Sequence, residues 1–443
     1  MPEIVSYKKI WNVAYPIILG SIIQNVINVT DTAFLGRVGE IALGASAIGG
    51  VFYLTLIMLG LGFSVGTQII VARRYGERKY PEIGAIIEHS LYFLVSVSII
   101  LVFSIKLSLP SLFGVIIESN EIREASIVFL NYRIFGLFFA FINFGFRAFF
   151  IGIGRTKVIT ITTIIMTLVN VFLDYALIFG NYGFPELGIE GAAIASVVAE
   201  MIVAIFFFIY VTKIIDVSEF KIFTFKKFDF AILKRVLNVA FPMMMQNFLS
   251  FVGWFFFFLF VEKMGERPLA ISNIIRSIYV VMLIPIMGFS SATNTFVSFV
   301  IGRNQKHDVI PVIMRIVKMC VSGVFFLVLI NLIFPEKVLS VYTNNMELIQ
   351  ESIPALYVIS GTAFFIAVGF VLFSGVSGTG NTKTSFTIEL IVLIVYVFIT
   401  YLFTNVFNYD ISGIWAVEFI YGGLIGTLSV IYLKSGKWKE KVL

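Results

Sequence analysis

Charged residues are scarce in this sequence. Asp, Glu, Lys and Arg make up 13% of its 443 residues, where soluble domains average about a quarter. Hydrophobic residues reach 59%, and the mean hydropathy is +0.99. Apolar runs of about twenty residues, long enough for a helix to cross the hydrocarbon of a bilayer, recur from end to end. These proportions exclude a soluble globular protein and predict a polytopic membrane protein.

Cysteine and histidine are almost absent. A single cysteine, Cys320, excludes an internal disulfide. The two histidines, His89 and His307, belong to no nucleophile–base or metal-ligand set, so an intramembrane enzyme is the weakest of the functions considered and no cofactor is expected. The net charge of +6 does not indicate a nucleic-acid partner, because the basic residues lie in the loops between apolar runs.

The apolar runs predict an all-α protein with twelve membrane-spanning helices. The first run follows an acidic and then basic start and lacks a small-residue cleavage site, so we expect it to be retained rather than cleaved as a signal peptide. The spans are expected near residues 11–35, 43–70, 84–105, 126–150, 158–180, 189–212, 234–260, 269–298, 312–334, 352–376, 384–406 and 411–433.

Basic residues are distributed unevenly among the connections between spans. One alternate set carries 21 Lys and Arg residues, and the opposite set carries six. Because positive charge is retained on the cytoplasmic side, both termini are expected there. The compact chain is typical of a prokaryotic protein, so we expect a monomer in the cytoplasmic (inner) membrane, in contact with lipids.

The sequence repeats itself at a constant offset of 226 residues. Six spans per half is an even number, so both halves insert in the same orientation, as two six-helix bundles related by a pseudo-two-fold axis along the membrane normal. We predict an N-lobe at 1–212, a cytoplasmic linker at 213–233 and a C-lobe at 234–443, which is the architecture of an alternating-access carrier. The matching pairs are "NVAYP" (12–16) and "NVAFP" (238–242), Gly39-Glu40 and Gly265-Glu266, "GFS" at 62–64 and 288–290, Thr67 and Thr293, Gly76 and Gly302, and "GRTK" (154–157) and "GNTK" (380–383).

Two predicted helices of the N-lobe carry polar stripes. Ionisable groups at membrane depth cost several kcal/mol on insertion scales, so they usually face the protein interior and serve a function. Carboxylate, amide and hydroxyl oxygens on facing helices suit a hard cation such as sodium, and two partly desolvated carboxyl groups close together can carry a proton instead. The stripes are Gln24, Asn28 and Asp31 in the first span, and Thr163, Thr167, Asn170 and Asp174 in the fifth.

The second half lacks these acids. At the offset of 226, Asp31 corresponds to Phe257 and Asp174 to Thr400, while glycines and prolines are kept. A requirement of the scaffold would be repeated in both halves, so the sequence assigns the cation site to the N-lobe alone.

Other charges in the spans are weaker candidates. Glu200 suits either a cleft-lining role or a structural ion pair, and Arg147 suits anchoring near a helix end. Arg276 is a candidate partner for substrate or for an acid of the C-lobe. For Glu389 and Glu418 we favour hydrogen bonds between helices.

Five segments together give the chain its resemblance to a known family. They are "QNVINVTDTAFLGRVGEIALGA" (24–45), "FRAFFIGIGRTK" (146–157), "NVFLDYALIFG" (170–180), "GIEGAAIAS" (188–196) and the repeated turn ending in Lys383. Over its whole length the chain resembles the multidrug and toxic compound extrusion (MATE) family. The resemblance implies an antiporter that exports cationic or lipophilic small molecules, driven by sodium or proton influx.

The resemblance also implies which residues carry the coupling ion. In the family these are an acid of the first helix, an Asn and an Asp of the fifth, and a hydroxyl of the sixth. By motif they fall on Asp31, Asn170, Asp174 and Ser196, with Ser in place of the more usual Thr. Acids that the NorM-type branch carries in its seventh and tenth helices are missing around 250–257 and 364–372, so the chain resembles the DinF-like and archaeal members instead.

The expected mechanism is rocking between two states. A bend of the first helix at Pro16 or Gly20 would respond to neutralisation of Asp31. The alternatives are a lipid or lipid-linked oligosaccharide flippase, for which Arg147 and Arg276 would bind pyrophosphate, and an ion channel, for which no filter or charge ring is present. Whether sodium or protons drive transport stays open at this point.

Overall fold

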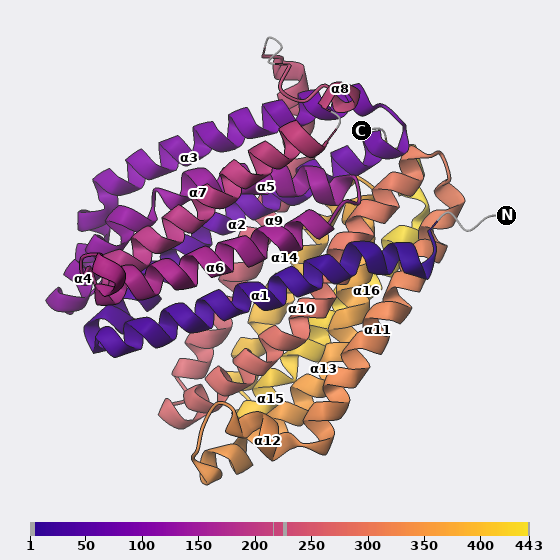
Figure 1. Ribbon diagram of the computed structural model, residues 1–443. Helices are drawn as coiled ribbons and strands as arrows, with labels where there is room; N and C mark the ends of the chain where they lie inside the picture. The colour runs from indigo at the N-terminus through magenta and orange to yellow at the C-terminus, as the bar shows by residue number, and fades with distance from the viewer. Residues whose placement is uncertain (1–4, 216, 225–227, 442–443) are drawn as a thin grey trace. The chain divides into compact units, whose positions relative to one another are not determined.

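Helices make up the computed structural model, which describes residues 5–215, 217–224 and 228–441 (Figure 1). Within these ranges no strand is present, and eleven helices are long and apolar enough to cross a membrane, or twelve if one bent pair counts as a single span. All twelve predicted spans fall on these helices, so the all-α membrane fold is confirmed. The helices are α1 (Tyr7–Val38), α2 (Glu40–Gly76), α3 (Tyr80–Ile116), α4 (Asn120–Arg133), α5 (Gly136–Gly152), α6 (Lys157–Phe179), α7 (Ile189–Ile214), α8 (Val217–Phe220), α9 (Phe230–Glu262), α10 (Glu266–Gly302), α11 (Val309–Ile333), α12 (Pro335–Ser340), α13 (Met346–Gly378), α14 (Thr382–Asn405), α15 (Ile411–Trp415) and α16 (Val417–Ser435), with short 3-10 turns at Asn181–Gly183, Lys306–Asp308 and Lys437–Glu440.

The predicted span at 126–150 is not one helix. It consists of α4 and α5, and the chain bends by 47° between them. Gly136 lies where the two helices join, and a Cβ there would displace the ends of the Arg133 and Glu200 side chains. Because α4 also begins earlier than predicted, capped by the Ser119 hydroxyl, the sequence-based bounds were too narrow here.

The helix bounds repeat at the offset found in the sequence. Both α2 and α10 contain 37 residues, and they begin at Glu40 and Glu266, which are 226 positions apart. The 33 residues of α13 cover the positions equivalent to α4 and α5 without a break. The turns repeat as well, because Gly154 (φ 74°) and Gly380 (φ 87°) both adopt the left-handed conformation that favours glycine.

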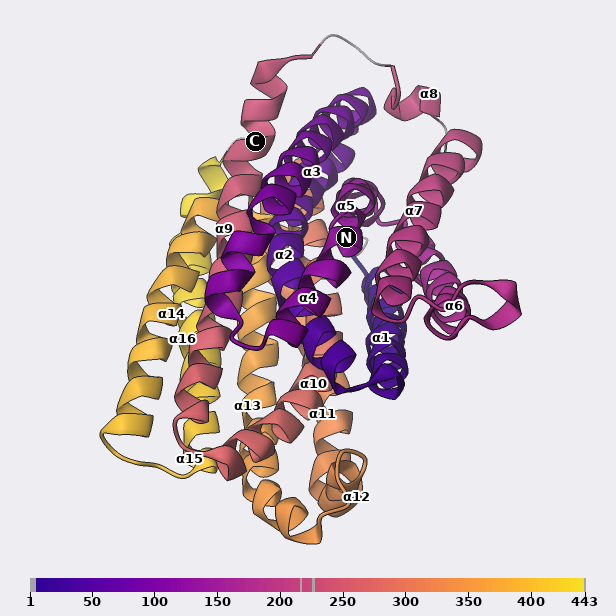
Figure 2. The same cartoon turned by 90° about the vertical axis from the view of Figure 1, so that its left-hand side faces the viewer.

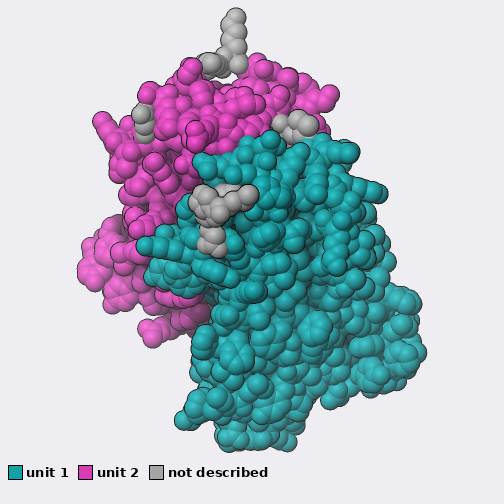
Figure 3. All heavy atoms as spheres, turned by 90° about the vertical axis from the view of Figure 1, so that its right-hand side faces the viewer, with its two compact units in different colours: residues 1–18, 241–443 teal, residues 19–240 magenta. Residues whose placement is uncertain are grey.

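The chain divides into two compact units (Figure 3). Unit 2 is residues 19–240, and unit 1 joins residues 1–18 to residues 241–443. Both boundaries lie inside helices, in α1 shortly after Pro16 and in α9 shortly before Pro242. The first turns of α1 are therefore packed with the second repeat of the sequence, while the stretch that carries Asp31 belongs to unit 2.

Within each unit a few helix pairs position the buried polar residues. In unit 2, α6 packs along α7 and α2 along α5 (Figure 2). In unit 1, α13 is the central helix and packs against α10, α11 and α16. These close pairs bring side chains from distant parts of the sequence together in each unit.

Glycines set the distance between α13 and α16, which gives a stability prediction. A Cβ at Gly422 would lie 2.9 Å from the Ile366 backbone nitrogen, whereas a Cβ at the neighbouring Gly423 meets nothing within 4 Å. We expect Gly422→Ala to lower the free energy of unfolding by about 1–3 kcal/mol through overpacking. Gly423→Ala is the matched control and should be neutral or slightly stabilising. Thermal unfolding of both variants in detergent micelles is the measurement, and equal effects would contradict the packing argument.

Candidate functional site

The polar stripe of α6 faces the interior of unit 2. Asn170 and Asp174 are fully buried, and Thr163 and Thr167 are nearly so. Each threonine hydroxyl donates to a backbone carbonyl one turn earlier in α6 and keeps its oxygen lone pairs as acceptors. The stripe therefore presents hydroxyl, amide and carboxyl oxygens to the interior of unit 2.

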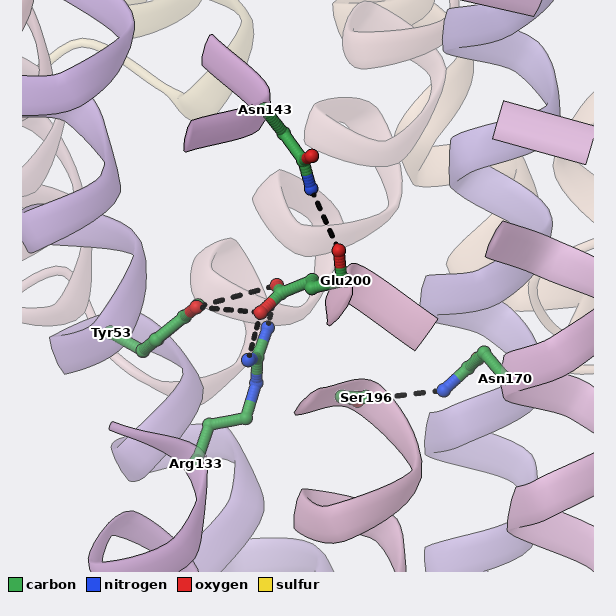
Figure 4. A network of polar contacts seen from close by, with 6 residues as sticks. All are labelled: Tyr53, Arg133, Asn143, Asn170, Ser196 and Glu200. Carbon is green, nitrogen blue, oxygen red and sulfur yellow. Dashed lines mark hydrogen bonds and ion pairs between the residues drawn. The ribbon is translucent and has the colours of Figure 1, made fainter. Parts of the chain in front are cut away.

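Helices α1 and α7 bring two further groups to this stripe. Asp31 of α1, which is half-buried, lies beside Asp174. On the other side, the Asn170 side-chain amide donates to the Ser196 hydroxyl of α7 over 3.5 Å (Figure 4). The structure thus brings together Asp31, Asn170, Asp174 and Ser196, which come from three helices.

Four buried oxygens of this group accept no hydrogen bond from any described residue. They are Asp31 Oδ1, both carboxyl oxygens of Asp174 and the Asn170 side-chain carbonyl oxygen. Buried acceptors without donors are costly, so a site of this kind favours a bound cation or a proton. All four atoms are oxygens, which fits a hard cation. Among the described residues no group of three or more His, Cys, Asp or Glu side chains is placed to hold a metal ion.

A second polar network lies beside the acids, and it contains a residue that the sequence analysis missed. Arg133, the last residue of α4, forms a two-pronged ion pair with Glu200 of α7, with N–O distances of 2.7 and 3.0 Å (Figure 4). The Tyr53 hydroxyl donates to the same carboxylate at 3.2 Å, and the guanidinium lies over the Tyr53 ring, 3.7 Å from its centroid. Asn143 donates to the Glu200 backbone carbonyl at 3.0 Å. Of the two predicted roles for Glu200, the structure shows the ion pair.

Arg133 also acts on the acid pair electrostatically. Its positive charge is within range of both Asp31 and Asp174. At the C-terminal end of α4 a cation is further stabilised by the helix dipole. The sequence did contain a signal for this residue, because Arg133, like Arg147, is a charged residue inside the predicted span 126–150.

Some predicted residues lie away from this group. Asn28 is exposed and Gln24 half-exposed, and neither side chain contacts the acids through a described hydrogen bond. The structure therefore does not add Asn28 or Gln24 to the group around Asp174. Helix α1 approaches α6 near Gly20, where a Cβ would lie 3.4 Å from the Thr163 hydroxyl oxygen.

The two arginines singled out in the sequence form no ion pair with a described acid. Arg276 is exposed and lies over the Phe258 ring at 5.0 Å, so the structure does not bring it to an acid of the second repeat. Arg147 is half-buried and forms no ion pair within the described ranges. Glu389 and Glu418 do make hydrogen bonds between helices, as expected.

Comparison with known proteins gives the family. The MatE family model matches residues 16–176 and again 242–402, so its two matches start and end 226 positions apart, at the offset of the internal repeat. The probable multidrug resistance protein NorM of Thermotoga maritima is 26% identical over 463 aligned positions, which cover 100% of this chain and 95% of that protein.

Solved structures share the fold. A MOP superfamily transporter from Pyrococcus furiosus, described as having a binding pocket of reversed polarity, superposes with a TM-score of 0.88 at 19% identity, covering 98% of this chain and 97% of its own. An outward-facing multidrug resistance MATE family transporter gives a TM-score of 0.90 at 20% identity, covering 97% of this chain and 95% of its own. From the two family matches, the repeat and the helical fold, we conclude that the chain belongs to the MatE family of multidrug efflux transporters and is a multi-pass membrane transporter, not an enzyme.

Proposed function

We propose that the protein is a secondary antiporter that exports cationic or lipophilic small molecules by alternating access, driven by inward flow of protons or sodium through the Asp31–Asp174 site. The observation that carries this proposal is the set of four buried acceptor oxygens without donors. Such a set is stabilised by a cation or a proton and destabilised by its loss, which is what a coupling site must do.

The charge balance around the acids explains how loading changes the site. With both carboxyl groups ionised, Asp31 and Asp174 repel one another and are held by Arg133, whose charge is already shared with Glu200. A proton or Na⁺ removes part of that repulsion and weakens the pull of Arg133. Since Asp31 is on α1, loading alters the force on that helix.

Helix α1 is suited to transmit such a change. Its residues 7–18 belong to unit 1 and its residues from Leu19 onward to unit 2. Pro16 has no backbone N–H to donate to the helix, and Gly20 adds conformational freedom one turn later. We place the bend that accompanies transport at these two residues.

The two coupling ions make different demands on the site. A proton needs only the facing carboxyl groups, whereas Na⁺ would be held by Asp31, Asp174, the Asn170 carbonyl and the Ser196 hydroxyl together. Removing the Ser196 hydroxyl therefore weakens sodium binding and leaves a shared proton in place.

The experiment that tests the proposal is dye transport into inverted vesicles that contain the full-length protein, with sodium and pH gradients imposed separately. We expect one of the two gradients alone to drive dye movement. In Ser196→Ala a sodium-driven transporter needs a several-fold higher sodium concentration, while a proton-driven one transports as before. Transport that neither gradient accelerates would contradict the proposal.

The setting of the transporter is part of the same proposal. The excess of basic residues in alternate connections supports cytoplasmic termini in a prokaryotic inner membrane. The internal repeat supports an N-lobe, a linker and a C-lobe within one chain, which we propose acts as a monomer. No described contact favours the flippase or channel alternatives.

A further inference from the structure

Unit 1 contains two buried carboxyl groups that the proposed transport site does not use. Glu389 of α14 and Glu418 of α16 are each 1% exposed. Burying an ionised carboxylate without a positive partner is strongly unfavourable, so the groups around each one decide its state.

Hydroxyl groups, rather than cations, surround both acids. Tyr279 of α10 and Tyr396 of α14 donate to the two oxygens of Glu418, at 2.8 and 2.9 Å. Ser250 of α9 donates to Glu389 at 2.6 Å.

Tyr421 of α16 connects the two acids. Its hydroxyl donates to Glu389 at 2.9 Å, and it is also within electrostatic range of Glu418. Its ring lies 5.5 Å from that of Tyr396, measured between centroids. The four hydroxyl-bearing side chains and two acids thus form one continuous cluster, here called the glutamate–tyrosine cluster.

No positive charge neutralises this cluster within the described part of the chain. The titratable groups that α10, α14 and α16 direct at the two acids are Tyr279, Tyr396 and Tyr421, and α9 contributes the Ser250 hydroxyl. Aromatic rings pack against the tyrosines, with Trp415 of α15 beside Tyr279 and Phe370 of α13 beside Tyr421. None of the ion pairs among described residues includes Glu389 or Glu418.

The internal repeat provides a comparison within the same chain. Tyr53 and Tyr279 are equivalent at the offset of 226, and each donates to a buried glutamate on the last long helix of its repeat, Glu200 or Glu418. In the first repeat Arg133 balances the glutamate charge. The equivalent position in the second repeat is Ile359, so there the balancing charge is missing.

We propose that the glutamate–tyrosine cluster is a second proton-binding site, separate from Asp31 and Asp174. A proton that binds an oxygen of Glu418 converts the carboxylate to a carboxylic acid, and one tyrosine hydroxyl turns from donor to acceptor of the new O–H group. Tyrosine hydroxyls serve in both roles. The ligand is a proton rather than a metal ion, because the surrounding hydroxyls already direct their hydrogens at the acids and leave no ring of free acceptors.

The test is infrared difference spectroscopy of the full-length protein in detergent, comparing low and high pH. We expect a carboxylic-acid carbonyl band to persist in an Asp31→Asn/Asp174→Asn double variant. Adding Glu418→Gln should remove the component of this band that Glu418 contributes, and Tyr396→Phe, which keeps the acid but removes one donor, should shift the frequency of that component. Proton uptake on acidification should fall by one proton per molecule in Glu418→Gln alone.

Controls separate the cluster from the rest of the protein. Glu347→Gln, which changes an exposed acid near Arg267, should leave the band unchanged. If Glu418→Gln does not fold, the shift in Tyr396→Phe decides instead. Loss of the whole band in the Asp31→Asn/Asp174→Asn variant would overturn this inference and leave the proposed transport site intact. Transport that does not depend on an ion gradient would overturn the proposed transport site and leave this inference intact.

Discussion

Cells that express Asp174→Asn are expected to be as drug-sensitive as cells without the transporter. Asp174 is fully buried, and neither of its carboxyl oxygens has a hydrogen-bond donor among the described residues. Asparagine has nearly the same shape but takes up no proton and brings no negative charge to a cation. Its amide would also donate to the Asp31 carboxylate, so the variant resembles a site that is permanently loaded.

The same reasoning predicts that Asp174→Asn inserts and folds normally, because it replaces a buried carboxyl group whose oxygens lack hydrogen-bond donors with a neutral group of similar shape. The measurement is the minimum inhibitory concentration of a cationic drug, alongside the amount of folded protein in the membrane. Asp410→Asn is a matched control, since Asp410 is an exposed N-cap of α15 and asparagine caps equally well. Resistance at the wild-type level in Asp174→Asn would rule out a coupling role for this acid.

A large loss of stability is expected for Arg133→Ala. The side chains of Arg133 and Glu200 are 14% and 12% exposed, and their two-pronged ion pair joins α4 to α7. Without the arginine, the Glu200 carboxylate keeps only the Tyr53 hydroxyl as a side-chain partner. Deleting one partner of a buried ion pair lowers the free energy of unfolding by about 3–5 kcal/mol. Thermal or denaturant unfolding of the purified protein in micelles measures this loss.

A double variant separates the charge from the packing. Arg133→Met combined with Glu200→Gln removes both charges while keeping similar volumes, so most of the lost stability should return. Because Arg133 also acts on Asp31 and Asp174, transport by this stable double variant should still be impaired. If Arg133→Ala unfolds at the wild-type temperature, the ion pair does not hold these helices together.

The sequence predicted those features that repeat along one helix or at one offset. The spacing of Asn170 and Asp174 placed them on one face of α6, and that face is buried. The offset of 226 is visible in residue pairs such as Gly39 and Gly265, which both precede a 37-residue helix. Helical periodicity and repetition are local properties, so they are readable without a structure.

Several features that depend on how helices meet were not predicted. The spacing of Asn28 and Asp31 placed both on one face of α1. In the structure Asp31 is half-buried, whereas Asn28 is exposed. Arg133 and Glu200 lie 67 positions apart, and their pairing follows from the bend between α4 and α5, which no proline signals. The acids of the second repeat were recognised from their depth in the spans, and the hydrogen bonds between helices expected for Glu389 and Glu418 are present.

The proposed antiport links substrate to the ion held by Asp31 and Asp174, because the two favour different states of the transporter and binding of one lowers the affinity for the other. It is tested most directly by adding a cationic substrate to the purified full-length protein and measuring the protons or radioactive sodium released. The account predicts release from the wild type and its loss in the Asp31→Asn/Asp174→Asn variant under conditions where both are folded. Equal release from the two proteins would contradict it.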